Sequence, residues 1–296
     1  MVGCGDVGMR VARQLTAPGA RVRLLAMTSS PERVPLLRAA GMTPLCANLD
    51  DPASLRRMSG LAQKVLHLAP PSQGRDGEGQ HDRRTLALIR ALRLRSTPQA
   101  LVYGSTTGVY GDCQGALVSE ERPVSPHTAR AQRRVDAERL VRWYGRSGVR
   151  TTTMRIPGIY AQDREGGTPR ERLLKGTPVL RFQEDVYTSH IHADDLARAC
   201  LLALWRGRPQ RVMNISDDSR MKMGDYFDLA ADLMGLPRPR RISRADADRS
   251  LPLILLSFMS ESRQLDNQRM KRELRLALRY PHVRDGLGVQ GTLFGP

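Results

Sequence analysis

The sequence predicts an α/β protein with a doubly wound parallel sheet and a smaller C-terminal lobe. Three observations lead to this prediction. A stretch of the form G-x-G-x-x-G lies at residues 3–8, strands and helices alternate as far as residue 107, and the chain of 296 residues is 40% hydrophobic. A chain of this length and composition can build one large α/β unit and a smaller lobe.

The glycine-rich stretch has the spacing of a dinucleotide-binding loop of the Rossmann type. Such a loop uses its first glycine, here Gly3, for a tight turn after a strand, and its second, Gly5, for the close approach of a pyrophosphate. Its third, Gly8, lets a helix pack close to the sheet, and the helix start binds phosphate. We expect Gly3, Gly5, Asp6, Val7 and Gly8 to contact the coenzyme. By itself the hexapeptide also fits an ordinary glycine-rich turn.

A helix should begin inside this loop. Val7, Val11 and Leu15 recur every four residues, which is the spacing of an apolar stripe along a helix. Arg10 lies off that stripe, on the side predicted to be polar.

The strand before the loop is unusually short. Only Met1 and Val2 precede the first glycine, whereas strands usually have about five residues. We expect either that the first strand is reduced to a stub, or that the recorded start lies inside the natural reading frame.

Composition and charge narrow the function classes. The formal net charge is +17, but the basic residues are spread along the chain and aromatic residues make up only 4% of it, so we expect a solvated arginine-rich surface and no nucleic-acid partner. The charge should still attract phosphorylated or carboxylated ligands.

The four cysteines have no metal-ligand spacing, which is typical of a reducing compartment and predicts no metal site. No apolar run reaches the roughly 18 residues of a membrane span, and no signal peptide precedes the loop. We therefore expect a cytoplasmic protein that contacts no membrane.

The alternation of elements predicts a parallel sheet with helices on both faces. The expected strands are residues 21–27, 42–47, 64–69 and 100–103, the first entered through a turn at 18–19, and the expected helices are 31–40, 52–59 and 82–95, with a surface loop at 72–80. Ligands bind beyond the carboxyl ends of such strands. The loops that should share this edge are 3–8, 28–30, 48–51, 69–71 and 104–107.

Four segments resemble a known family. They are residues 103–112 (Tyr-Gly-Ser-Thr-Thr-Gly-Val-Tyr-Gly-Asp), 154–160, 190–197 and 212–216. Together they resemble the NAD-dependent epimerase/dehydratase branch of the short-chain dehydrogenase/reductase superfamily, in an atypical subgroup with G-x-G-x-x-G. The resemblance covers roughly residues 1–285. It implies a dinucleotide-binding domain over 1–160, completed by parts of 186–218, and a substrate lobe mainly over 161–296.

The expected coenzyme-binding residues come from all the strand ends at one edge. Beyond the glycine loop they are Thr28, Ser29, Ser30, Arg33, Asn48, Leu49, Leu68, Ala69, Pro70, Ser105 and Pro157. The resemblance places the last of these, the proline of segment 154–160, beside the nicotinamide.

The end of the second strand predicts the choice of coenzyme. An NAD site usually has Asp or Glu about 20 residues beyond the glycine loop, where it holds the ribose 2′-OH. Here Thr28, Ser29 and Ser30 take that place and Arg33 follows, which suits a 2′-phosphate. NADP is therefore favoured. NAD stays the alternative, because Glu32 could hold the diol if the loop shifts.

The resemblance implies catalysis by a Ser or Thr with a Tyr-x-x-x-Lys pair, and this chain departs from it. Thr106 matches the Ser/Thr position, where it either orients substrate or only caps the strand end. One register of residues 126–138 puts the Tyr and Lys positions at Arg130 and Arg134, and another puts them at His127 and Ala131. Arginine keeps its proton near neutral pH and cannot replace tyrosine as a proton donor.

Arg130 and Arg134 are the remaining candidates for a catalytic role at this helix. They lie four residues apart and share one helix face. On that face they either clamp a carboxylate or phosphate near the nicotinamide or point to solvent.

The acidic stretch with His192, Asp194 and Asp195 resembles an acid–base set. We interpret these residues instead as the cap and anchor of a helix that starts at 196.

Two functions remain open. One is an NAD(P)-dependent oxidoreductase or epimerase acting on a small, anionic hydroxyl or carbonyl substrate, with Thr106 beside the nicotinamide and a proton from water or an unidentified group. The other is an NADP(H)-binding sensor or interaction protein with little or no turnover.

Two later segments have predicted roles. Arginines of the loop 166–172 could face the substrate. The apolar cluster at 245–261 should be mostly core, with one face available for a homodimer if the protein is not a monomer.

Overall fold

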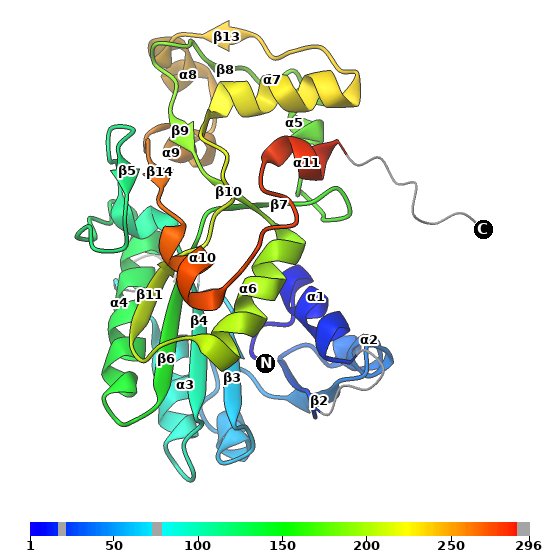
Figure 1. Ribbon diagram of the computed structural model, residues 1–296, viewed down its shortest axis with the longest axis vertical. Helices are drawn as coiled ribbons and strands as arrows, with labels where there is room; N and C mark the ends of the chain where they lie inside the picture. Colours follow the sequence, from blue (N-terminus) through cyan, green and yellow to red (C-terminus); the bar gives the residue numbers. More distant parts are fainter. Residues whose placement is uncertain (17–21, 73–78, 289–296) are drawn as a thin grey trace.

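In the computed structural model, which describes residues 1–16, 22–72 and 79–288, a parallel sheet carries helices on both faces and a second lobe sits beyond one end of its strands (Figure 1). The strands of the sheet are β1 (Leu25–Thr28), β2 (Thr43–Cys46), β3 (Lys64–His67), β4 (Ala100–Thr106), β6 (Arg150–Ile156) and β11 (Arg211–Asn214). Their order is β2-β1-Val2-β3-β4-β6-β11, and all pairs are parallel. This order reverses direction at Val2, so the glycine loop lies at the switch point where such sheets bind ligands.

Val2, directly before the glycine loop, pairs with a strand on either side. The Val2 N–H donates to the Leu66 carbonyl at 2.8 Å, and Leu68 N–H donates to the Val2 carbonyl at 2.7 Å. On the other side Met27 N–H donates to the Met1 carbonyl at 2.9 Å. Through these bonds Met1 and Val2 join β1 and β3 into one sheet.

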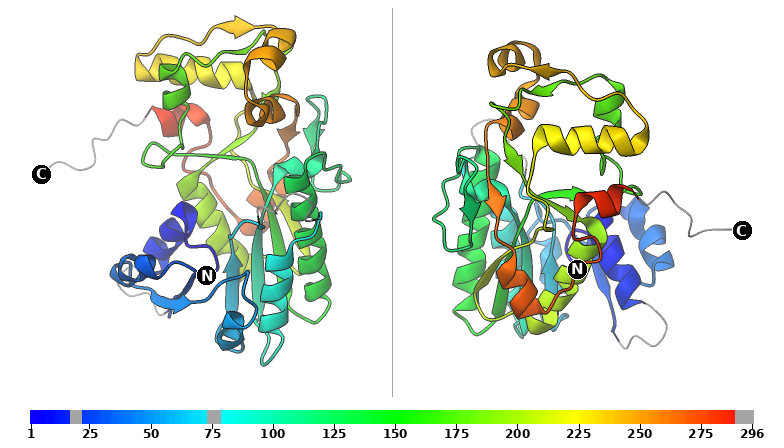
Figure 2. Two further views of the ribbon diagram at one scale, coloured as in Figure 1. Left: turned by 180° about the vertical axis from the view of Figure 1, so that it is seen from behind. Right: turned by 45° about the horizontal axis from the view of Figure 1, so that its top comes forward.

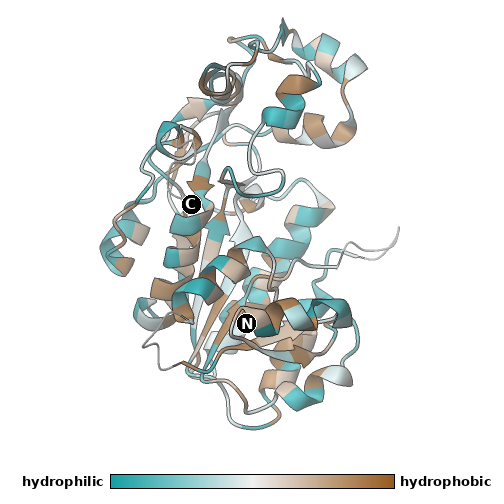
Figure 3. Ribbon diagram, turned by 90° about the vertical axis from the view of Figure 1, so that its right-hand side faces the viewer, coloured by the Kyte–Doolittle hydropathy of each residue, from teal (hydrophilic) through white to brown (hydrophobic). Residues whose placement is uncertain are grey.

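The two faces of the sheet have separate hydrophobic cores. Leu66, Val102 and Met154 pack toward α1 (Asp6–Leu15) and α6 (Ala193–Arg206). The neighbouring residues, among them Val65, Leu101 and Tyr103, pack toward α3 (Arg83–Leu92) and α4 (Ala129–Gly145). This alternation follows from the two-residue period of a strand. Figure 2 shows the two helix layers on either side of the sheet, and in Figure 3 the strands are mostly hydrophobic while the helices carry many hydrophilic residues.

Several expected elements are shorter than predicted. The second strand is Leu25–Thr28, and the turn at 18–19 and part of the loop at 72–80 lie outside the described residues. The predicted helix at 31–40 is a 3-10 turn (Pro31–Arg33) followed by α2 (Val34–Ala39), and the one at 52–59 is only a 3-10 turn (Ser54–Met58). Helix α3 begins at Arg83, because the Asp82 side chain accepts hydrogen bonds from the N–H groups of Arg84 and Thr85.

The second lobe has a core of its own and lies at the top of Figure 1. Its elements are α5 (Arg170–Leu174), β8 (Val179–Leu180), α7 (Met223–Met234), β13 (Arg241–Ile242), α8 (Arg244–Ser250), α9 (Leu253–Met259) and α11 (Val283–Leu287). The remaining strands and turns are a 3-10 turn (Thr107–Tyr110), β5 (Leu117–Val118), β7 (Gly158–Tyr160), β9 (Tyr187–Thr188), β10 (His190–His192), β12 (Met221–Lys222) and β14 (Gln264–Leu265). Helix α10 (Gln268–Leu274) packs against α6 and β11.

The predicted apolar cluster at 245–261 is only partly core. Met259 is buried in the second lobe, but Leu253 and Phe258 are exposed. Among the residues that the structure describes, no helix is both long and apolar enough to cross a membrane.

Candidate functional site

The three glycines of the loop meet different surroundings. Gly3 has φ of +90°, and a Cβ added to it would lie 2.3 Å from the Ala69 backbone nitrogen. A Cβ on Gly8 would lie 2.8 Å from the Gly3 carbonyl oxygen. A Cβ on Gly5, the residue that caps α1, would meet no atom within 4 Å. The first and third glycines are thus required by close packing, while the second leaves open space at the start of the helix.

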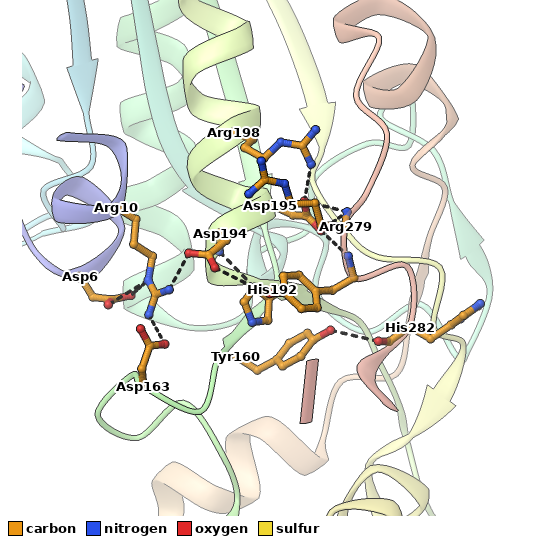
Figure 4. Close-up of polar contacts among 11 residues, drawn as sticks. Asp6, Arg10, Tyr160, Asp163, His192, Asp194, Asp195, Arg198, Arg279 and His282 are labelled. Atoms are coloured by element: carbon orange, nitrogen blue, oxygen red, sulfur yellow. Dashed lines mark hydrogen bonds and ion pairs between the residues drawn. The ribbon is translucent and has the colours of Figure 1, made fainter. Parts of the chain in front are cut away.

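Arg10 is buried, although the sequence placed it on the polar side of α1. Its guanidinium binds three carboxylates, at 3.1 Å to Asp6, 2.5 Å to Asp163 and 2.6 Å to Asp194 (Figure 4). Arg164 binds the second oxygen of Asp6 at 2.7 Å. The network ties the glycine-loop helix to α6 and to the loop after β7. Helical periodicity could not predict it, because two of the three carboxylates come from distant parts of the chain.

The start of α6 is a structural cap, as the sequence analysis proposed. The helix begins at Ala193, and His192 Nδ1 accepts a hydrogen bond from Asp194 N–H at 3.2 Å. The Asp195 carboxylate is fully buried and accepts bonds from the N–H groups of Arg279 and Tyr280, at 2.9 to 3.0 Å (Figure 4). This carboxylate holds the C-terminal segment and takes no part in the cavity described below.

The residues after β1 lie beside the glycine loop. Arg33 Nη2 donates to the Cys4 carbonyl at 2.6 Å, so its guanidinium rests against the loop itself. The Thr28 hydroxyl is used locally, since it bonds the backbone of Ser30. Ser29 and Glu32 are exposed. Of the residues predicted to bind the coenzyme here, Arg33 therefore lies against the glycine loop, whereas the Thr28 hydroxyl is hydrogen-bonded within its own turn.

The other predicted coenzyme residues reach this edge mainly through their backbone. Ala69 lies directly under Gly3, and the Leu49 side chain packs in the core. Asn48 Oδ1 accepts from the Asp50 N–H at 3.0 Å. The remaining positions follow β3, β4 and β6 and are Leu68, Pro70, Ser105 and Pro157, of which the serine hydroxyl donates to Glu138 Oε1 at 2.6 Å.

A cavity of about 700 Å³ lies between the ends of β4 and β6 and the second lobe. Thr106, Pro157 and Arg130 line the side nearest the sheet, and Arg172 and His190 line the other side. Thr106 Oγ1 also accepts from the Gly108 N–H at 3.4 Å, so it caps the strand end and faces the cavity at once. The volume is that of a site for a small ligand.

Helix α4 contains Arg130 and Arg134 of one register and Ala131 of the other. Arg130 lies in its first turn and is exposed at the cavity. Arg134 is buried, and its Nη1 donates to the Gly104 carbonyl at 2.7 Å and to the Tyr103 hydroxyl at 3.0 Å. His127 precedes the helix and is exposed. The shared face of the two arginines thus points toward the end of β4 and the cavity.

Several cavity residues escaped the sequence analysis. They form an aromatic wall, with Tyr160 on β7, His190 on β10, and Tyr226 and Phe227 on α7. His190 stacks on Tyr226 with ring centroids 4.3 Å apart and meets Tyr160 edge-on at 6.3 Å. Burial lowers the pKa of His190 to about 4. The His-x-His alternation of a short strand was a signal for His190, but the wall itself joins elements far apart in sequence.

Asp217 lies behind this wall and supports a pH-dependent prediction. It is 3% exposed, its Oδ2 has no hydrogen-bond partner among the described residues, and burial raises its pKa to about 8. The folded protein therefore keeps a proton that the unfolded chain releases above its usual pKa of 3.8, and the free energy of unfolding falls as pH rises from about 4 to 8.

Asp217→Asn should remove this dependence. We expect the variant to match the wild type near pH 4 and to be more stable by about 2–4 kcal/mol at pH 8, measured by thermal unfolding at both values. Asp218→Asn is the matched control: despite partial burial, hydrogen bonds from Asn267 and Lys271 lower the pKa of Asp218, so that variant should lose stability at pH 8. A destabilised Asp217→Asn at pH 8 would show that the buried carboxyl is ionised.

A sequence profile described as the NAD dependent epimerase/dehydratase family matches residues 3–216. No curated protein sequence matches the chain. Among residues placed by the structure, no group of three or more His, Cys, Asp or Glu side chains could hold a metal ion.

Solved structures share the fold along nearly the whole chain. A functionally unknown conserved protein from Silicibacter pomeroyi is 30% identical, with 97% of this chain and 95% of that chain covered and a TM-score of 0.79. UDP-glucose 4-epimerase from Thermotoga maritima, solved with UDP-glucose, is 21% identical over 97% and 94% of the two chains, with a TM-score of 0.76. A dTDP-glucose 4,6-dehydratase from Streptomyces venezuelae, solved with NAD, is 20% identical over 96% and 92%, with a TM-score of 0.75.

Proposed function

Because this chain belongs to the NAD-dependent epimerase/dehydratase family, we propose that it binds NADP(H) at the glycine loop and acts on a small, anionic hydroxyl or carbonyl compound in the neighbouring cavity. The observation that carries this proposal is the composition of the cavity. Thr106 and Pro157 line it beside the sheet, and two arginines without carboxylate partners among the described residues, Arg130 and Arg172, also line it. Such a cavity favours a negatively charged ligand held next to a nicotinamide.

The residues at the sheet edge fit a dinucleotide. The open space at Gly5 and the start of α1 suit a pyrophosphate, and Arg33 is close enough to the loop to meet a 2′-phosphate. The backbone of Ala69 and Ser105 would line the groove, and Pro157 would lie beside the nicotinamide. When bound, the coenzyme supplies hydride exchange.

The residues of this chain must then orient the substrate and supply a proton. Thr106, which lines the cavity, would hold the reacting oxygen. In one register Arg130 takes the family's tyrosine position, where a guanidinium cannot give up a proton near neutral pH, and in the other His127 takes it. Burial raises the pKa of the cavity residues Tyr160 and Tyr226, which is opposite to what an acidic tyrosine needs. We infer that the proton comes from water or from another group of the cavity, such as Tyr187.

Turnover is tested with NADPH and a panel of carbonyl compounds that carry a carboxylate or phosphate, each paired with an uncharged analogue. We expect oxidation of NADPH with acidic members only. Arg130→Ala should lower kcat/KM about tenfold or more while the affinity for NADPH stays unchanged. Equal turnover of the acidic compounds and their uncharged analogues, or an unchanged kcat/KM in Arg130→Ala, would contradict the proposal of an anionic substrate.

The coenzyme preference gives a second test. We expect NADPH to bind more tightly than NADH, because Arg33 and Ser29 can meet the 2′-phosphate. Arg33→Ala should erase most of the preference and leave the affinity for NADH nearly unchanged. Fluorescence titration of both coenzymes measures this, and Arg38→Ala, an exposed arginine of α2, is the control. A wild-type affinity ratio of one or below would instead point to NAD.

The absence of Tyr-x-x-x-Lys favours a second candidate function. With Arg130 and Arg134 at those positions, the protein would be a catalytically reduced NADP(H) sensor or interaction protein. Tight coenzyme binding without turnover of any member of the carbonyl panel would support this function over the first.

A further inference from the structure

We propose that Arg172 is the anchor that binds the acidic group of the substrate, a carboxylate or phosphate monoester, at the end of the cavity formed by the second lobe. This inference rests on the proposed function and adds a residue and a place for the substrate's charge. Arg172 lies on α5, lines the cavity, and is only partly exposed.

The guanidinium of Arg172 lacks a hydrogen-bonding partner where one is needed. Its Nε and Nη2 atoms are buried and have no partner among the described residues. Arg172 has two such nitrogens, whereas Arg133, Arg134, Arg150 and Arg155 have one each. The last three of these also make hydrogen bonds, to the Gly104 carbonyl, the Leu204 carbonyl and the Glu138 carboxylate. Burial accordingly lowers the pKa of Arg172. A buried, unpaired charge is costly, and an anion that binds it recovers that cost.

Three carboxylates near the cavity bind other arginines. Glu261, which lines the cavity, binds Arg263 at 2.7 Å. Asp228 on α7 binds Arg241 at 2.5 Å, and Asp185 binds the same arginine at 3.4 Å. Within the part of the chain that the structure describes, no carboxylate forms an ion pair with Arg172.

The aromatic wall fixes where the guanidinium can point. Arg172 stacks over the Phe227 ring at 4.4 Å, and Phe227 packs edge-on against Tyr226 at 5.7 Å. The stack fixes the plane of the guanidinium, and a carboxylate or phosphate that reaches Nε and Nη2 would accept two parallel hydrogen bonds from its edge. A ligand bound there would extend across the cavity toward Thr106, which lines the opposite side.

The experiment measures anion binding directly, by calorimetric titration of the full chain with malonate and with inorganic phosphate at constant ionic strength, with and without NADP⁺. The coenzyme competes with phosphate at the glycine loop but not at Arg172. We expect binding in the presence of NADP⁺ to weaken at least about tenfold in Arg172→Met and to stay unchanged in Arg170→Met, an exposed arginine of the same helix. The stronger of the two probes identifies the acidic group.

Further readouts separate this inference from the proposed function. Arg172→Met should melt at the same or a higher temperature, because it removes an unpaired charge and keeps an apolar side chain on Phe227. Arg172→Lys keeps the charge without the two-bond geometry and should bind with intermediate affinity. Equal anion binding by the wild type and Arg172→Met, or no binding by the wild type, would overturn the inference. Failure of NADP⁺ itself to bind would instead overturn the proposed function.

Discussion

Replacing Gly5 with alanine should weaken NADPH binding at least about tenfold, a change of about 1.4 kcal/mol, without destabilising the protein. Gly5 has φ of −72° and ψ of −161°, which alanine adopts without strain, and its Cβ would meet no atom within 4 Å. That open space is where a pyrophosphate at the start of α1 should lie. The added methyl group would therefore exclude the coenzyme from a protein that is otherwise intact. Fluorescence titration and thermal unfolding measure the two effects separately.

Gly3→Ala is the matched control with the opposite signature. At φ of +90° and with its Cβ 2.3 Å from the Ala69 nitrogen, an alanine at Gly3 must displace the end of β3. We expect a strongly lowered Tm or loss of folded protein. If Gly5→Ala binds NADPH as tightly as the wild type, the coenzyme does not approach the helix at this residue and the proposed site is misplaced.

Arg10→Met should lower the free energy of unfolding by about 3 kcal/mol, the low end of the cost of removing one partner of a buried ion pair, because the carboxylates left behind are partly exposed. Arg10 is 4% exposed, and its loss leaves Asp6, Asp163 and Asp194 without their shared cation. Because these carboxylates join α1, α6 and the loop after β7, we also expect weaker coenzyme binding. Denaturant unfolding gives the stability change.

The control for Arg10→Met lies on the same helix. Arg13 is exposed, and Arg13→Met should change stability by less than about 0.5 kcal/mol. A loss of under about 1 kcal/mol in Arg10→Met would mean that the network contributes little more than a surface ion pair. Measuring both variants at high salt adds a check, because buried pairs are screened less than exposed ones.

The features that could be predicted from the sequence alone depend on residues that are close together in the chain. The periods of strands and helices predicted a sheet with helices on both faces, the glycine spacing located the loop at its switch point, and His192 was identified as a cap. These features depend on residues a few positions apart, so they can be found without the fold. The departure at Arg130 and Arg134 was also visible, because a helix register needs only nearby residues. The roles of these arginines in binding and catalysis stay predictions.

The tertiary structure decided which charges are buried and which remain without a counter-charge. Arg10 binds carboxylates 153 and 184 residues away along the chain, which turns a predicted polar-face residue into a buried one. Val2 completes a strand that the sequence shows only as a stub, because both neighbouring strands supply hydrogen bonds to it. The unpaired guanidinium of Arg172 could not be read from its loop, since its pairing depends on carboxylates elsewhere that the fold commits to other arginines. Charge pairing and burial are set by side chains from distant segments, and only the folded chain brings those segments together.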